Sequence, residues 1–68
     1  MQIINHKTGS VFTAYTVQDR AGFASCITMR QGNREVLIGR EVYPTRSRAY
    51  KSAVKFCKTR AAREGVTA

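Results

Sequence analysis

Residues 46–63 read RSRAYKSAVKFCKTRAAR, and this stretch decides the fold because it carries two stripes at helical spacing. One stripe is small or apolar and is expected to face a core: Ala49, Tyr50, Ala53, Val54, Cys57 and Ala61. The stripe on the opposite face is cationic, with spacings of three, four and three residues: Arg48, Lys51, Lys55 and Lys58. The sequence therefore predicts a helix over residues 46–64 that packs through one face and is positively charged on the other.

The expected ends of this helix carry their own signals. Thr45 is expected to be the N-cap, because its hydroxyl can accept a hydrogen bond from a free amide of the first turn. The capping box is incomplete, since Arg48 stands where Glu would complete it. Pro44 ends the preceding segment, and Gly65 is expected to stop the helix.

Upstream of Pro44, residues 11–18, 23–30 and 35–43 are predicted to be strands. The alternation in residues 11–18 leaves open which of their faces is buried. In the second segment the better core face consists of Phe23, Ser25, Ile27 and Met29. In the third segment Val36, Ile38 and Val42 are expected inside, and Glu35 and Glu41 outside.

Turn signals separate these strands. Residues 19–22 are expected to form a four-residue hairpin loop with Gly22 at positive φ, and residues 31–34 a second turn. Gly39, in the middle of a predicted strand, indicates a bulge or close packing. Residues 1–6 contain Ile3 and Ile4 and are a candidate for a further short strand.

Residues 1–68 are thus predicted to be a single small α+β domain. A three-stranded antiparallel sheet, or a four-stranded one if residues 1–6 join it, packs against one C-terminal α-helix. The alternative architecture is a small barrel-like sheet with the helix as a plug.

The charge balance points to polyanionic partners. Twelve Lys and Arg residues face four acidic ones, giving a net charge of +8 and a pI near 10.4. A membrane surface is the less favoured polyanion, because the apolar side of the helix is rich in alanine and is needed by the sheet. The alternative is a generally basic protein whose charged helix face is merely solvated.

The two cysteines and the N-terminus indicate a cytoplasmic protein. No apolar leader or membrane span is recognisable, so Cys26 and Cys57 are expected to stay reduced and to act as small buried hydrophobes. With a single histidine, the paired-ligand spacing of a zinc site is absent, and no cofactor is expected.

No constellation of acid, base and nucleophile is recognisable, so the protein is expected not to be an enzyme. Glu35 and Glu41 lie six residues apart on one predicted strand, about 20 Å, which is too far for a catalytic carboxylate pair. His6 has no evident carboxylate partner.

The cationic helix face is the candidate binding surface. Lys and Arg side chains neutralise backbone phosphates and release counterions, and a helix start can bind one more phosphate through its free amides. The sequence predicts contact with double-stranded RNA or DNA through Thr45, Arg46, Arg48, Lys51, Lys55, Lys58 and Arg63.

The strand order and the start of the helix resemble the C-terminal βββα part of double-stranded RNA-binding domains. In that family the last helix begins with Ser and a lysine cluster, followed by small alanines that pack on the sheet. Here Thr45, Ala49 and Ala53 match that spacing, and Arg46 falls on the first basic position. The resemblance implies that Arg46, Arg48 and Lys51 contact phosphates across a duplex groove.

The same βββα order also resembles, less closely, DNA-binding domains of plant transcription factors and of some phage integrases, which read DNA with the sheet. That mode is disfavoured here if the open sheet face carries Glu35 and Glu41, although Arg20, Arg30 and Arg34 lie near the hairpin tips. A different function is a protein-interaction adaptor that docks on an acidic partner and exposes an apolar sheet patch around Ala24, Cys26 and Leu37. A homodimer through an edge strand is a further expectation.

Overall fold

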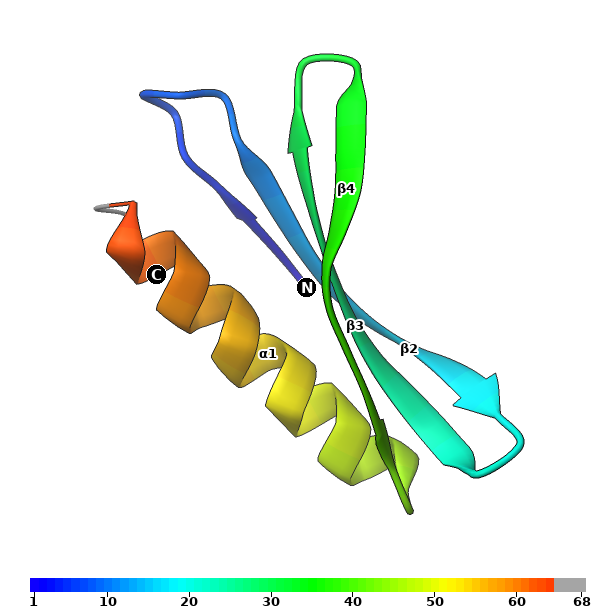
Figure 1. The fold of residues 1–68 in the computed structure, drawn as a ribbon. Coiled ribbons are helices and arrows are strands. Elements are labelled where there is room, and N and C mark those ends of the chain that lie inside the picture. The colour runs from blue at the N-terminus through cyan, green and yellow to red at the C-terminus, as the bar shows by residue number, and fades with distance from the viewer. Residues whose placement is uncertain (65–68) are drawn as a thin grey trace.

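A computed structural model describes residues 1–64, in which four strands precede one helix (Figure 1). In chain order these are β1 (Gln2–Ile4), β2 (Val11–Asp19), β3 (Gly22–Gln31), β4 (Arg34–Tyr43) and α1 (Arg46–Arg63). The strands form one antiparallel sheet in the order β1-β2-β3-β4, and α1 covers one face of it. This confirms the α+β class and the four-stranded form of the sheet. The predicted stop at Gly65 lies outside the described residues.

The hairpin between β2 and β3 turns more tightly than the sequence predicted. Asp19 pairs with Gly22, so the expected four-residue loop is a two-residue turn. The Asp19 carboxylate closes it by accepting the Ala21 N–H at 3.0 Å, and Gly22 adopts a φ of +142°. The second turn has Gly32 at a φ of +58° between paired Gln31 and Arg34, which suits a type II′ turn.

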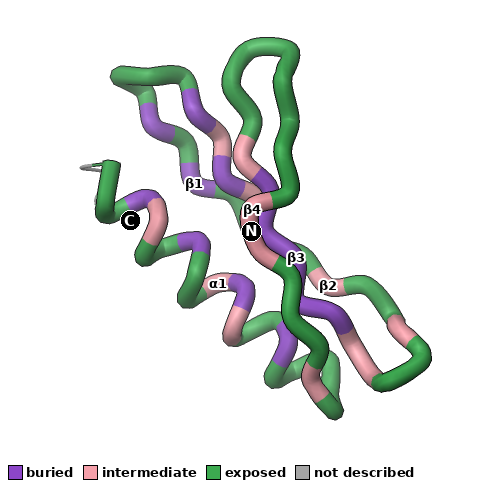
Figure 2. Tube along the Cα trace, viewed as in Figure 1, coloured by how far each residue is buried: buried purple, intermediate pink, exposed green. Residues whose placement is uncertain are grey.

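The core lies between α1 and the sheet and is built from small helix residues. Ala49, Ala53, Cys57 and Ala61 are fully buried, and they recur on the sheet side of α1 (Figure 2). Opposite them lie the sheet residues of the core, three of which are larger: Ile3, Phe12 and Ile27, with Ala14 beside them. Because the helix residues are short, α1 can lie close to the sheet while the strands supply the bulk.

The structure corrects the predicted core stripe at Tyr50, which is not part of the core. Tyr50 is 43% exposed, although the helical spacing placed it with the buried residues. The four residues that recur every fourth position make the contact, and Tyr50 falls on the flank of that stripe. A ring cannot enter the narrow space that the alanines define. Val54, by contrast, packs against the core as predicted.

A bulge in β4 overturns the predicted faces of that strand. Leu37 pairs with Thr28 and Gly39 with Ile27, so Ile38 is an extra residue in β4. Alternation is therefore reversed beyond it, and Val36 and Val42 lie on opposite faces. Both are exposed, contrary to the prediction, whereas Ile38 packs against the core as expected.

Gly39 combines the two roles that its position indicated. It adjoins the register shift, and a Cβ there would lie 3.2 Å from Ile27 Cδ1 and 3.3 Å from the Phe56 ring. The same reversal puts Glu41 on the helix side of the sheet, where it accepts a hydrogen bond from the Tyr43 hydroxyl at 2.7 Å. Of the two glutamates expected on the open sheet face, only Glu35 lies there.

The face of the sheet turned away from α1 is called the outer face below. Its central strand, β3, contributes Ala24, Cys26 and Thr28, which are buried even though no helix covers them. The prediction that Phe23, Ser25, Ile27 and Met29 form the better core face is therefore incomplete, because residues on the other face of β3 are buried as well. Small side chains on the central strand are shielded by larger ones on β2 and β4. Both cysteines are free and buried, as expected.

Candidate nucleic-acid interface

The start of α1 is organised by Thr45 and Arg46. The Thr45 hydroxyl accepts the Arg48 N–H at 3.2 Å, which confirms the predicted N-cap. The Arg46 guanidinium lies 5.3 Å from the centroid of the Phe23 ring, a cation–π distance. Arg46 is therefore held against the end of β3, apart from the other helix cations.

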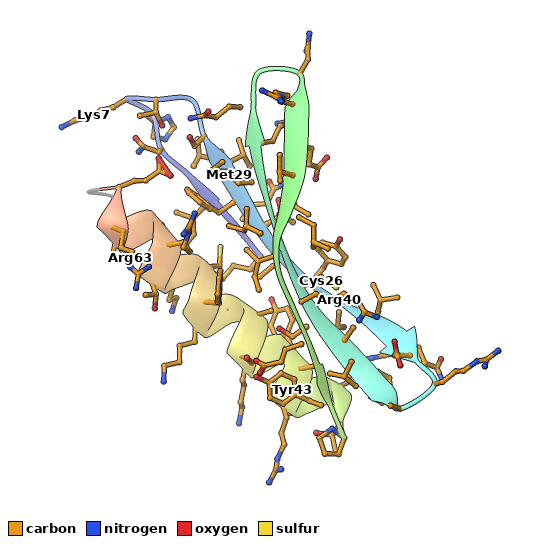
Figure 3. The ribbon with its side chains drawn as sticks, in the orientation of Figure 1. Lys7, Cys26, Met29, Arg40, Tyr43 and Arg63 are labelled. Atoms are coloured by element: carbon orange, nitrogen blue, oxygen red, sulfur yellow. The ribbon has the colours of Figure 1, made fainter. Side chains whose placement is uncertain are left out.

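Four cations form a continuous line on the side of α1 that faces away from the sheet. Arg48, Lys51, Lys55 and Lys58 are all exposed, and Figure 3 shows nitrogen-tipped side chains extending from α1 away from the strands. We call these four residues the basic row. It spans about 15 Å, since ten residues of helix rise 1.5 Å each.

No carboxylate among residues 1–64 neutralises the basic row. The ion pair of the described part of the chain joins Arg40 to Asp19 at 2.7 Å, on the sheet. The Ala21 N–H and the Arg40 guanidinium together hold the pKa of the Asp19 carboxyl below its usual value. Glu35 lies on the outer face. Glu41, on the helix side of the sheet, accepts a hydrogen bond from the Tyr43 hydroxyl, and Glu64 lies beyond the row, near Asn5.

The flanks of α1 hold residues that the sequence analysis did not assign to the cationic stripe. On one flank Tyr50 and Val54 line an open groove of about 430 Å³ together with lysines of the basic row. On the other flank Phe56 and Arg60 line a groove of about 320 Å³. Arg63, which the sequence predicted to contact nucleic acid together with the row, also lines this second groove. The exposure of these aromatic residues could have been predicted from the sequence. The small residues that pack on the sheet recur strictly every fourth position, which leaves the neighbouring aromatic residues outside the contact.

The described residues lack the features of a metal site, a reactive thiol or a membrane-spanning helix. Within residues 1–64 no three His, Cys, Asp or Glu side chains gather as a metal site would require. Burial raises the pKa of the Cys57 thiol, which favours the protonated and unreactive form. Across the same residues, α1 falls short of the length and apolarity needed to cross a membrane.

Comparison of the chain with protein-family models, curated proteins and solved structures finds no match. The observed element order is ββββα, a four-stranded antiparallel sheet followed by a C-terminal helix.

Proposed function

We propose that this protein binds nucleic acid through the basic row, which contacts the backbone phosphates of a duplex. The observation that carries the proposal is the uninterrupted line of four exposed cations without an acidic neighbour. Like charges three and four residues apart destabilise a helix by a few tenths of a kcal/mol per pair. A polyanion removes that repulsion and gains the entropy of released counterions.

The start of α1 supports a further phosphate contact beside Arg48. The Thr45 hydroxyl accepts a backbone hydrogen bond, which leaves its own hydrogen free to donate to a phosphate oxygen. Ser47 adds a second exposed hydroxyl in the same turn. The free amides and the helix dipole favour an anion at this end.

The resemblance to double-stranded RNA-binding domains favours a duplex as the ligand. Ala49 and Ala53 pack on the sheet, in the role that the resemblance assigns to them. Double-stranded RNA-binding domains also have a helix before their three strands. At the corresponding place this chain has the short strand β1. Contact would therefore depend on α1 alone, and with no Asn or Gln on the helix we expect weak sequence specificity.

The integrase-like mode, in which the sheet reads DNA, is less well supported. The outer face carries Glu35 and the Asp19–Arg40 ion pair, and its remaining exposed side chains are largely apolar. Such a surface offers few free cations to phosphates. For this reason we assign the contact to the helix.

The proposal is tested by fluorescence anisotropy with labelled double-stranded RNA, double-stranded DNA and single strands over a range of salt concentrations. For four to five engaged phosphates, log K should fall against log salt with a slope of about −4 on a duplex. Charge reversal of two row residues, Lys51→Glu with Lys55→Glu, should reduce that slope by about 2 units, because two phosphate contacts are lost.

A matched control reverses Arg20 and Arg34, which lie at the two hairpin turns of the sheet and not on α1. Both double variants change the net charge from +8 by the same amount, so only the position of the charge differs. Equal weakening by the two variants would reject the row as the binding surface. Absence of polynucleotide binding even at low salt would favour the alternative, an adaptor that docks on an acidic protein.

A further inference from the structure

The outer face of the sheet is an apolar surface that α1 does not cover. Exposed apolar side chains line it on both sides of β3: Tyr15 and Val17 from β2, Leu37 and Val42 from β4. Their exposed fractions run from 38% for Tyr15 to 50% for Leu37. We call these four residues the outer apolar face. Side chains of this size are rarely left in contact with water as a contiguous group.

The pairing register gives this face a defined relief. One row across the sheet reads Val17–Ala24–Val42, so a small central residue stands between two larger ones. In the next row Cys26 lies between Tyr15 and Arg40; Figure 3 labels Cys26 and Arg40. Ala24 is 0% and Cys26 4% exposed, so the larger side chains of β2 and β4 close over β3. These flanking side chains form the surface that a second sheet would meet, as facing sheets do in β-sandwiches.

The charges of the outer face balance, unlike those of the whole chain. Arg40 is paired with Asp19 at 2.7 Å, and Arg30 lies directly opposite Glu35 on the neighbouring strand. Two of the four acidic residues of this +8 chain therefore lie on the one face that is apolar. Two copies would repel each other through their helices but can meet here without net charge.

The area of the face indicates how strong such an interface can be. Strands of nine or ten residues are about 30–33 Å long, and β2, β3 and β4 spaced about 4.8 Å apart give a surface roughly 10–14 Å wide, since β1 is short. Each copy would then bury about 300–450 Å², or about 600–900 Å² in total. That range is below the size of stable complexes and fits a weak dimer that forms only at high concentration.

We propose that two copies of this chain pair face to face through the outer apolar face. The dimer has four layers, helix–sheet–sheet–helix, with two-fold symmetry. Both basic rows then lie on opposite outer surfaces, as far apart as the assembly allows. This arrangement differs from pairing through an edge strand, which would leave the outer face in water. It does not depend on nucleic-acid binding.

Sedimentation velocity of the full chain from about 5 to about 500 µM tests the proposal by mass action. The wild-type chain should shift with concentration from 7.6 kDa to twice that mass. A lysine on the β4 side of the face, Leu37→Lys, should raise the dissociation constant at least 100-fold, because it buries an added charge in each copy. A chain that stays at 7.6 kDa at the highest concentration would overturn the proposal.

The neighbouring residue supplies the matched control. Val36 is 49% exposed, close to the 50% of Leu37, but pairs with Met29 on the opposite face. Val36→Lys should therefore leave the dimer unchanged. Since both substitutions are at exposed positions of β4, a folding defect would affect both and would appear in circular dichroism. A dimer that withstands Leu37→Lys would point to edge-strand pairing and reject the face-to-face arrangement.

Discussion

At the scale of single residues, Gly22 is the position that tolerates least change. Its φ of +142° is one that side-chain-bearing residues rarely adopt, and a Cβ there would collide with the Tyr43 carbonyl oxygen. We expect Gly22→Ala to lower the free energy of unfolding by about 3 kcal/mol or more, the sum of backbone strain and a steric clash. Urea denaturation followed by circular dichroism measures this loss.

A substitution at Gly32 separates the effect of backbone strain from that of the steric clash. Gly32 also has positive φ, at +58°, but nothing lies within 4 Å of the position where its Cβ would be. Gly32→Ala should therefore cost only the strain, about 1 kcal/mol. Equal losses at the two glycines would show that the close approach of Tyr43 to Gly22 contributes nothing.

At the scale of elements, the packing of α1 on the sheet depends on side-chain size. Ala53 is fully buried in the middle of the contact. Ala53→Leu should destabilise the fold by about 1–3 kcal/mol, because the larger side chain forces the helix away from the strands. Helix propensity hardly changes between these residues, so the effect reports packing. Thermal and urea unfolding both measure it.

The control for this element lies on the solvent side of the same helix. Ala62 is exposed, so Ala62→Leu makes the same chemical change without filling the contact. Its effect on the free energy of unfolding should be within about 0.5 kcal/mol. A loss at Ala62 as large as that at Ala53 would mean that leucine disturbs the helix itself.

The elements also show which features were predictable from the sequence. The bounds of α1, its Thr45 cap and its alanine stripe follow from local signals, namely spacing, capping chemistry and the preceding proline. The extra residue Ile38 in β4 does not, because a bulge is defined only by the partner strand. Burial of Ala24 and Cys26 likewise depends on larger neighbours across the sheet. The basic row was visible as spacing, whereas the diversion of Arg46 to Phe23 is a tertiary contact.

At the scale of the whole molecule, the excess positive charge is concentrated on α1. On the outer face Asp19 and Glu35 are balanced by Arg40 and Arg30, and the basic row lies on the opposite side, beyond α1. A chain selected only for stability would mix signs along an exposed helix face. If the row is retained for binding, a substitution that breaks it should make the protein more stable and a weaker binder at once.

Lys51→Glu tests whether stability rises while binding weakens. It replaces two repulsive contacts, with Arg48 three residues before and Lys55 four residues after, by two attractive ones. The free energy of unfolding should rise by about 0.5–1 kcal/mol at low salt, and the gain should shrink as salt screens the pairs. Duplex affinity should fall in the same protein.

Arg34→Glu, at a hairpin tip, changes the net charge equally and should alter neither the free energy of unfolding nor the duplex affinity by a comparable amount. A Lys51→Glu variant that is less stable than the wild-type chain would mean that the basic row contributes to folding, and its uniform sign would then need no ligand to explain it.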